Sequence, residues 1–216
     1  MLVRDIMTTN VVTVSSDTLI LDAINIMRAH RIERLPVVDR GNLVGMVTKD
    51  VLERAAPSQA TSLTRWELEY LVAKMKIKDI MKKDVVSITA DFTVECAIAT
   101  AQAKKVGSLP VLENDKVIGI VTTNDFFYKI LNPLMGIGEE GVRIIVYGAG
   151  KAARMGKVMK CVEERDIRVM AVCTVSPAEG TDNDLLLHLY ADDATKIIAD
   201  LKGMGFAVNA REHKPC

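Results

Sequence analysis

The stretch Gly119-Ile120-Val121-Thr122-Thr123-Asn124-Asp125 (GIVTTND) ends an apolar run with hydroxyl, amide and carboxylate side chains packed into four residues. An earlier stretch, Gly45-Met46-Val47-Thr48-Lys49-Asp50 (GMVTKD), begins in the same way, but its carboxylate comes one residue sooner after the threonine. Apolar residues followed by Thr, Asn and Asp are typical of a buried strand that leads into the first turn of a helix. The two stretches therefore indicate an internal repeat whose copies differ at one polar position.

The similarity between the copies extends well beyond these stretches, at one fixed offset and without a gap. Arg4–Met7 (RDIM) corresponds to Lys78–Met81 (KDIM), and Leu35–Asp39 (LPVVD) corresponds to Leu109–Glu113 (LPVLE). Such regularity indicates duplication of one structural unit. A unit of about 50–60 residues buries little surface alone, so we expect the two copies to pack as a pseudo-two-fold pair.

Each copy predicts the same β-α-β-β-α order. A short strand precedes an amphipathic helix, and two apolar strands joined by a polar turn precede a second helix that starts near Thr or Asp. Asp17 and Asp91 precede the first helix of each copy, and we expect them to cap it. The expected strand, helix, strand and strand span Val11–Ser15, Thr18–His30, Arg34–Asp39 and Leu43–Thr48 in the first copy, and Val85–Thr89, Thr93–Lys105, Ser108–Glu113 and Val117–Thr122 in the second.

This combination of motifs resembles the CBS domain, present in tandem as a Bateman module, over residues 1–131. We assign residues 1–60 to the first repeat and 77–131 to the second. Residues 61–76 predict a linker helix that places Trp66 on an apolar face. This linker is similar to that of the acetoin-utilisation regulatory proteins, in which two CBS repeats precede an ACT domain.

The resemblance implies a cleft that binds an adenosine-containing ligand, which is AMP, ADP, ATP or S-adenosylmethionine. In this arrangement a carboxylate accepts hydrogen bonds from the ribose hydroxyls. The threonine hydroxyl and the N–H groups of the first helical turn then face the phosphate, where the helix dipole favours an anion. The main site is expected to consist of Thr122, Asn124, Asp125, Asn10, Val11, Val106, Gly107 and Ser108.

The first copy departs from this pattern. Val51 stands at the ribose-binding position and Asp50 comes one residue early, which rotates its side chain by about 100° on a helix. The resemblance also places a base that contacts phosphate at the position of Arg34. A weaker second site is therefore expected from Thr48, Asp50, Arg34, Asp84 and Val85. The alternative is that Asp125 and Asp50 are helix caps only.

The last third of the chain has a different pattern. Residues 132–140 contain Pro and several Gly residues and predict a domain linker. Residues 141–212 predict β-α-β-β-α-β, the ferredoxin-like order, which is similar to the ACT domain. ACT domains dimerise edge to edge and bind amino acids, but Lys151-Ala152-Ala153 lacks the Pro-Gly that lets an effector approach the backbone. We therefore expect a dimerisation or spacer role. The whole chain is predicted to be α+β.

A less favoured alternative is a nicotinamide dinucleotide site at Gly148-Ala149-Gly150. The run Tyr147–Ala153 (YGAGKAA) follows a predicted strand, opens a helix and matches the GxGxxA fingerprint. The next predicted strand, however, ends without the acidic residue that binds the ribose. The rest of the chain is also too short for a doubly wound sheet. We expect these glycines to form a turn.

Composition excludes several classes of function. The chain has 216 residues, of which 49% are hydrophobic, and its 28 basic residues balance 28 acidic residues. A net charge of zero gives no positive electrostatic potential that would attract nucleic acid or an anionic membrane. Aromatic residues, at 4%, are too few to indicate a surface on which bases stack. No apolar run approaches the ~18–20 residues that span a bilayer. We expect a cytoplasmic protein.

The sequence shows no catalytic constellation, because no nucleophile lies near a base. The four Cys and three His residues show no metal-ligand spacing, so no metal and no required cofactor are expected. The sequence therefore favours a non-catalytic regulatory sensor that binds an adenine nucleotide, forms a homodimer and reports to a protein partner. A structural or interaction module without a small-molecule ligand remains the main alternative.

Overall fold

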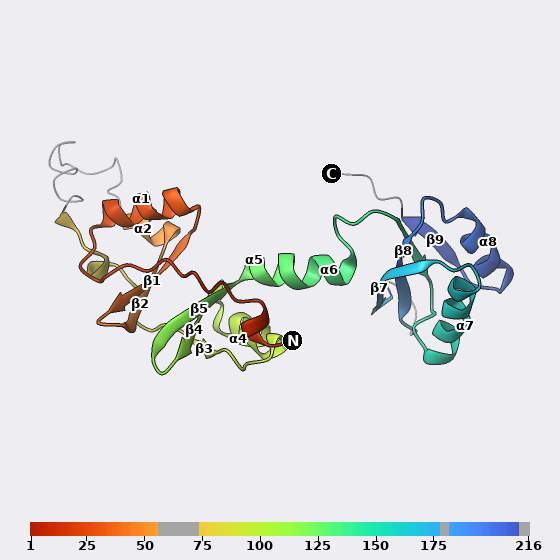
Figure 1. The fold of residues 1–216 in the computed structure, drawn as a ribbon, viewed down its shortest axis with the longest axis horizontal. Coiled ribbons are helices and arrows are strands. Elements are labelled where there is room, and N and C mark those ends of the chain that lie inside the picture. The colour runs from red at the N-terminus through yellow and green to blue at the C-terminus, as the bar shows by residue number, and fades with distance from the viewer. Residues whose placement is uncertain (56–73, 178–181, 212–216) are drawn as a thin grey trace. The chain divides into compact units, whose positions relative to one another are not determined.

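The computed structural model describes residues 1–55, 74–177 and 182–211 (Figure 1). The chain divides into two units, Met1–Phe126 and Phe127–Cys216, which are treated separately below. The predicted linker helix over residues 61–76 lies almost entirely outside the described residues.

The first repeat contains the predicted elements, with a strand region that is shorter than expected. Its elements are a 3-10 turn at Val3–Asp5, α1 (Ile20–His30), β1 (Arg34–Asp39), β2 (Asn42–Thr48) and α2 (Lys49–Ala55). β1 pairs antiparallel with β2 through a turn in which Arg40 and Gly41 both have positive φ. Of the predicted strand Val11–Ser15, only Val14 forms a bridge, parallel to Val37.

The second repeat reproduces this order and adds a short parallel strand. Its elements are a 3-10 turn at Ile77–Asp79, β3 (Ile88–Thr89), α4 (Val94–Lys104), β4 (Ser108–Glu113), β5 (Lys116–Thr122) and α5 (Thr123–Phe126). The sheet order is β3-β4-β5, with β3 parallel to β4 and β4 antiparallel to β5. Both hairpins carry an irregularity at the same place, between Val37 and Val38 and between Val111 and Leu112.

The opening segment of each repeat packs into the other repeat. The Val3 N–H donates to the Phe92 carbonyl at 2.9 Å, and the Ile77 N–H donates to the Thr18 carbonyl at 2.9 Å. Val3 and Ile77 are fully buried, and Ile77 belongs to the core of the first repeat. Because each core is completed by the other copy, the two repeats depend on one another for burial.

The glycines of the GIVT and GMVT stretches allow this exchange. A Cβ on Gly119 would lie 2.5 Å from Met7 Sδ, and one on Gly45 would lie 2.5 Å from Met81 Sδ. Backbone bridges join Thr8 to Ile120 beside the first of these contacts. In each copy, the methionine of the DIM motif therefore lies against the glycine of the other copy's GIVT or GMVT stretch.

Asp17 and Asp91 do not cap the helices, contrary to the prediction. The residue before α1 is Leu19, which supplies no side-chain cap, and the cap of α4 is Thr93, whose Oγ1 accepts from the Cys96 N–H at 3.2 Å. The helices begin two residues later than the aspartates require, so the carboxylates lie too far from the orphan N–H groups.

The two aspartates instead form ion pairs with the opening segment of the other repeat. Asp17 Oδ1 lies 2.9 Å from the Nζ atoms of both Lys76 and Lys78, and Asp91 pairs with Arg4. The two lysines hold the pKa of Asp17 below its ordinary value, at about 2, chiefly through the Lys76 hydrogen bond. These contacts tie the repeats together at their surface.

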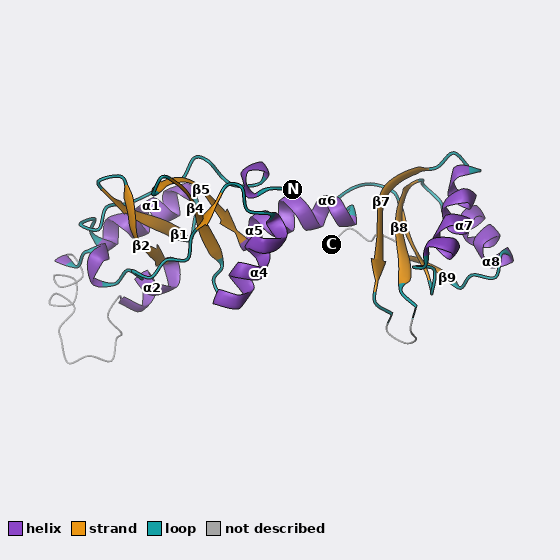
Figure 2. Ribbon diagram, turned by 90° about the horizontal axis from the view of Figure 1, so that it is seen from below, coloured by secondary structure: helices purple, strands orange, loops and turns teal. Residues whose placement is uncertain are grey.

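The second unit begins with a π-helical turn, Phe127–Leu131, and α6 (Asn132–Met135). The strands and helices that follow have the predicted order, and α7 and α8 cover one face of the sheet (Figure 2). They are β6 (Val142–Val146), α7 (Ala152–Glu163), β7 (Arg168–Val175), β8 (Asp184–Tyr190), α8 (Thr195–Gly203) and β9 (Val208–Arg211). The sheet is antiparallel in the order β7-β8-β6-β9.

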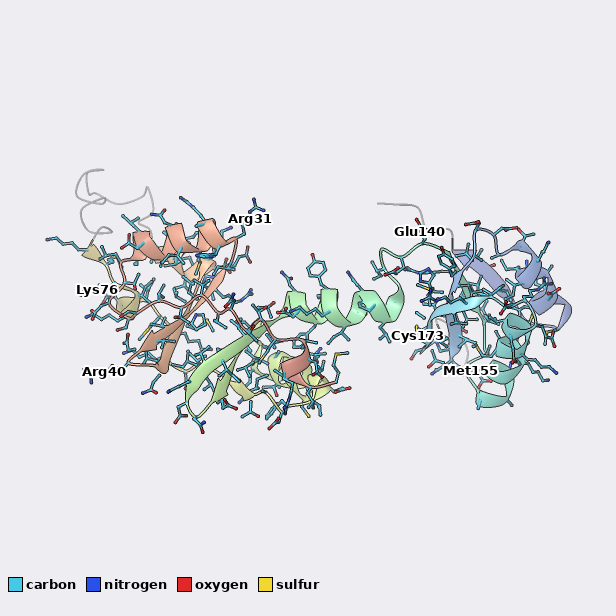
Figure 3. The ribbon with its side chains drawn as sticks, viewed as in Figure 1. Arg31, Arg40, Lys76, Glu140, Met155 and Cys173 are labelled. Atoms are coloured by element: carbon cyan, nitrogen blue, oxygen red, sulfur yellow. The ribbon has the colours of Figure 1, made fainter. Side chains whose placement is uncertain are left out.

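The segment predicted as linker 132–140 is held against the sheet of the second unit. Met135 Sδ lies 3.9 Å from Sγ of Cys173, which is on β7 (Figure 3). Arg143 Nη2 donates to the carbonyl of Gly136, the residue that ends α6 with a φ of 61°. His188 Nε2 lies 3.0 Å from the Glu140 carbonyl oxygen. Most of this linker is therefore attached to the second unit.

Candidate functional site

A cavity of about 410 Å³ lies in the first unit, between the opening residues of the first repeat and the start of α5. It brings together five residues of the predicted main site, although they come from opposite ends of the unit. These residues are Asn10, Val11, Thr122, Asn124 and Asp125. A volume of this size is within the range of roughly 300–1,000 Å³ that small-molecule sites occupy.

This cavity forms because the opening segment of the first repeat pairs with a strand of the second repeat. Thr8 and Ile120 exchange two backbone hydrogen bonds of 2.9 and 3.0 Å, which places Asn10 beside the end of β5. The parallel bridge between Val14 and Val37 places the preceding residues beside β1. The cavity is therefore built from both repeats.

The start of α5 has a rigid polar geometry. The Thr122 N–H donates to Asp125 Oδ2 at 2.8 Å, and the Thr122 hydroxyl donates to the same oxygen at 2.7 Å. The carboxylate thus caps the helix, as the capping alternative requires. A carboxylate has two oxygens and about four acceptor positions, so these contacts are compatible with ligand binding by the same group. They also fix its orientation towards the cavity that it lines.

The start of α2 in the first repeat lacks this geometry. Thr48 Oγ1 there accepts from the Val51 N–H at 3.4 Å, and the Asp50 side chain is exposed. The Val51 side chain cannot accept a hydrogen bond from Thr48, so the pair of hydrogen bonds that Thr122 donates to Asp125 has no counterpart here. The one-residue shift of the aspartate therefore changes the local structure and not only the sequence pattern.

The residues predicted for the second site do not line one common cavity among those of the described chain. Val85 lines a separate cavity of about 320 Å³ together with residues of the hairpin turns, such as Asn42 and Asp115. Arg34 lines the main cavity instead. Thr48, Asp50 and Asp84 line neither of these two cavities.

Three residues predicted for the main site, Val106, Gly107 and Ser108, do not line it. Their equivalents in the first repeat, residues 32–34, line it in their place. The cavity combines α5 of the second repeat with the strands of the first repeat, so the loop before β1 faces it and the loop before β4 does not. The sequence prediction placed the loop before β4 in the main site, whereas the loop before β1 lines this cavity.

Arg34 nevertheless connects the two loops. A Cβ on Gly107 would lie 2.6 Å from Arg34 Nη2, so the guanidinium group lies directly over this glycine. The absence of a side chain at Gly107 leaves room for Arg34 beside the cavity. Gly107 thus affects the site through Arg34 rather than by lining it.

The charged lining includes two residues that sequence reasoning missed, Arg31 and Glu33. Arg31 follows the last residue of α1 in a left-handed conformation, with a φ of 53° (Figure 3). Comparison with Lys105 and Gly107, which occupy the same places in the second repeat, could have identified them. With Arg34 and Asp125, two arginines and two acidic residues therefore line the cavity.

The Gly148–Gly150 loop uses its N–H groups within the chain. The Gly148 N–H donates to Asp184 Oδ1 at 2.8 Å, and the Gly150 N–H donates to the Asn183 carbonyl at 2.7 Å. A Cβ at Gly150 would lie 2.6 Å from the Asn183 side chain. A bound pyrophosphate requires these N–H groups, and the Asp184 carboxylate would repel it. The loop therefore has the turn role that the sequence favoured.

In the described part of the chain, no helix combines the length and apolarity that a membrane crossing requires. The same residues contain no group of three or more His, Cys, Asp or Glu side chains arranged to hold a metal ion.

Comparison with known proteins gives one consistent result for the first unit. The family model described as the CBS domain matches residues 3–56 and 77–132. A CBS domain-containing protein of Dictyostelium discoideum is 33% identical over 138 residues, which are 62% of this chain and 95% of that protein. The structure of a Vibrio cholerae protein described as an acetoin utilization protein (AcuB) has a TM-score of 0.52 and 28% identity, and the match covers 61% of this chain and 91% of that one.

An inosine-5'-monophosphate dehydrogenase of Methanocaldococcus jannaschii is also similar, with 31% identity over 217 residues. The match covers 91% of this chain but only 40% of that enzyme. The chain therefore spans well under half the length of this relative.

Proposed function

The chain belongs to the CBS-domain family, with two CBS domains in tandem, and we propose that it is a non-catalytic sensor of an adenosine nucleotide. The observation that carries the proposal is the cavity in which Asn10, Thr122, Asn124 and Asp125 meet two arginine side chains. It lies where the family resemblance implies an adenosine ligand.

The lining supplies a complementary group for each part of such a ligand. The Asp125 carboxylate, held by Thr122, accepts hydrogen bonds from the ribose hydroxyls. The apolar side chains of Val12, Ile32 and Ile120 provide a surface for the adenine ring. The remaining polar positions face the phosphate end of the ligand.

The two arginines favour a ligand that carries phosphate. Arg31 and Arg34 both line the cavity, and guanidinium groups bind phosphate oxygens in a bidentate manner. S-adenosylmethionine carries a positive sulfonium group, which has no such attraction to two guanidinium groups. We therefore place AMP, ADP or ATP before S-adenosylmethionine.

The response to the ligand is proposed to pass to the second unit. Its β-α-β-β-α-β order is that of ferredoxin-like ACT domains, and we propose that it is ACT-like and takes part in homodimerisation or in binding a regulated protein in the cytoplasm. The nucleotide must bind one arrangement of the protein better than the other, because equal affinities shift no equilibrium. Similarity to the Vibrio cholerae protein supports a role in acetoin or related carbon metabolism.

Isothermal titration of the full chain with AMP, ATP and S-adenosylmethionine, with and without Mg²⁺, tests the proposal. We expect micromolar binding near one site per chain, with AMP or ATP stronger than S-adenosylmethionine. No heat with any ligand, together with an unchanged melting temperature, would overturn nucleotide sensing. That outcome would favour an interaction module in which Asp125 only caps α5.

A further inference from the structure

A second cavity, of about 500 Å³, lies within the first repeat between α1 and α2. Its apolar lining consists of Ile24 and Met27 on α1, Ile32 in the loop after α1, and Leu52 on α2. Met27 and Leu52 are buried and the two isoleucines are half-buried, so these four side chains form the floor of the cavity. The volume is within the range of roughly 300–1,000 Å³ that small-molecule sites occupy.

Backbone hydrogen bonds fix the walls of this cavity. The Ile32 N–H donates to the Met27 carbonyl at 2.9 Å where α1 ends, with Arg31 in a left-handed conformation between them. The Lys49 N–H donates to the Glu33 carbonyl at 2.8 Å and joins the start of α2 to the same loop. The cavity is therefore part of the folded repeat and needs no ligand to assemble it.

The rim of the cavity consists of exposed charged side chains. They are Arg28, Arg31, Glu33, Lys49 and Glu53. Lys49 Nζ lies 3.9 Å from Glu53 Oε1, but an ion pair between exposed groups contributes little. In the described part of the chain, Arg28 and Arg31 form no ion pair. The rim therefore presents two guanidinium groups to an anion above the apolar floor.

The second repeat has the same backbone framework without these basic residues. Gln102 and Thr123 stand at the positions equivalent to Arg28 and Lys49. The hydrogen bond that ends α1 nevertheless has a counterpart of 2.9 Å at the end of α4, donated by the Val106 N–H. The fold of the repeat therefore does not require the basic rim, which is a feature of this cavity in the first copy.

We propose that this cavity binds a short aliphatic carboxylate. The hydrocarbon chain lies on the apolar floor, and the carboxylate accepts hydrogen bonds from Arg28 and Arg31, whose guanidinium groups suit bidentate contacts. The four side chains of the floor have no donor or acceptor for a sugar or a base. The class of ligand therefore differs from the nucleotide proposed for the other cavity.

The two cavities share part of their lining. Arg31, Ile32 and Glu33 line both of them. A carboxylate that binds Arg31 withdraws this guanidinium group from the phosphate of a nucleotide, so the two ligands should oppose one another. This antagonism rests on the proposed nucleotide function, whereas carboxylate binding does not.

Methyl NMR of the full chain, with hexanoate as the probe and no nucleotide, tests the site. Millimolar hexanoate should shift the methyl signals of Met27 and Leu52. Hexanol, which lacks the charge, and acetate, which lacks the hydrocarbon chain, should each bind about tenfold more weakly. Arg28→Gln, which introduces the residue of the second repeat, should also weaken hexanoate binding about tenfold. Arg54→Gln is the matched control, because Arg54 is an exposed arginine of α2 that does not line the cavity.

Three results would overturn the site. They are methyl signals that millimolar hexanoate leaves unchanged, equal losses in Arg28→Gln and Arg54→Gln, and hexanol binding as strongly as hexanoate. A fourth would also overturn it: signals that shift with protein concentration and not with hexanoate would place a second copy in the cavity. Circular dichroism checks that both variants are folded.

Titration of AMP with and without saturating hexanoate tests the antagonism. Hexanoate should lower AMP affinity severalfold, and Arg28→Gln should remove this effect, since Arg28 lines only the carboxylate cavity. Hexanoate that binds without changing AMP affinity would refute the sharing of Arg31 but not the site. A chain that binds hexanoate and not AMP would overturn nucleotide sensing alone.

Discussion

At the scale of single residues, the candidate site depends on where one aspartate lies relative to one threonine. Asp125 lies three residues after Thr122 and accepts both its N–H and its hydroxyl, whereas Val51 occupies the equivalent position after Thr48. Asp125→Ala should lower the affinity for AMP at least tenfold, which is about 1.4 kcal/mol, because the ribose loses its acceptor. Asp50→Ala should change the affinity less. Titration of both variants measures the difference, and equal losses would refute the asymmetry between the copies.

The same substitution has a separate effect on stability. Asp125→Ala removes the two hydrogen bonds that Thr122 donates to this carboxylate and should lower the free energy of unfolding by about 0.5–1.5 kcal/mol. A melt without ligand measures this cost. Loss of binding by a chain that melts well above the titration temperature then reports on the ligand and not on folding.

Gly107 provides a test of how Arg34 is positioned. Gly107→Ala would place a Cβ 2.6 Å from Arg34 Nη2, and the flexible guanidinium group can move away at little cost to folding. AMP affinity should fall severalfold while adenosine affinity stays nearly constant, because only the phosphate contact is displaced. In an Arg34→Ala background, Gly107→Ala should have no further effect, since the two changes act through one group. An undiminished effect in that background would show that Gly107 acts otherwise.

Sequence alone identified the polar cluster at the start of α5 but not the loop that faces it. Asn10, Asn124 and Asp125 line one cavity, as the resemblance to the CBS domain implied. Equivalent loops in a duplicated sequence look alike, and only the crossing of the repeats decides which loop faces which helix. For this reason residues 31–33 were not predicted, and Arg34 was predicted for the second site instead.

At the scale of elements, Asp17 was predicted to cap α1, but it forms ion pairs that the local sequence does not indicate. Asp17 resembles a cap in sequence, but its partners, Lys76 and Lys78, are far along the chain and become neighbours only in the folded protein. Burial shows the same dependence, because Ile77 is assigned to the second repeat in sequence yet fills the core of the first. The order of elements within each copy was predictable, whereas this exchange between copies was not.

The Asp17 ion pairs predict an acid-dependent part of stability. The pKa of Asp17 is lowered from 3.8 to about 2, so its contribution is fully present above pH 3.8 and is lost as the pH falls through about 2. The stability difference between the native chain and Asp17→Asn should therefore shrink over this interval, and it should also shrink with added salt because the pairs are exposed. Urea unfolding at several pH values measures it. Asp22→Asn on α1 is the matched control, and a difference that does not depend on pH would contradict the assignment.

Ile77 tests the exchange of core residues between the repeats. Ile77→Ala should lower the free energy of unfolding by about 2–5 kcal/mol, because a fully buried side chain leaves a cavity in the first repeat. Ile137→Ala, at an exposed position, should have a much smaller effect in dilute protein. Denaturant unfolding compares the two, and similar small losses would indicate that the opening segment of the second repeat is not part of this core.

At the scale of the whole molecule, the helical segment that begins beside the ligand cavity also leads into the second unit. α5 begins beside the cavity with Thr123, and the chain remains helical through the π-helical turn to Met135. A π-helical turn inside a helix is often found at functional sites and can adjust the rotation of the residues that follow it. The first turn of this segment, at the cavity, is therefore directly followed along the chain by the residues that open the second unit.

This arrangement predicts coupling between nucleotide binding and dimerisation. If the nucleotide favours the helix geometry that the dimer requires, saturating AMP should lower the dimer dissociation constant, and dimerisation should raise AMP affinity by the same factor. Sedimentation with and without AMP gives the first factor, and titration at low and high protein concentration gives the second. Asp125→Ala, which removes the proposed ribose acceptor of the cavity, should abolish both effects. A dissociation constant that AMP does not change would mean that the nucleotide signal reaches its target by a route other than dimerisation.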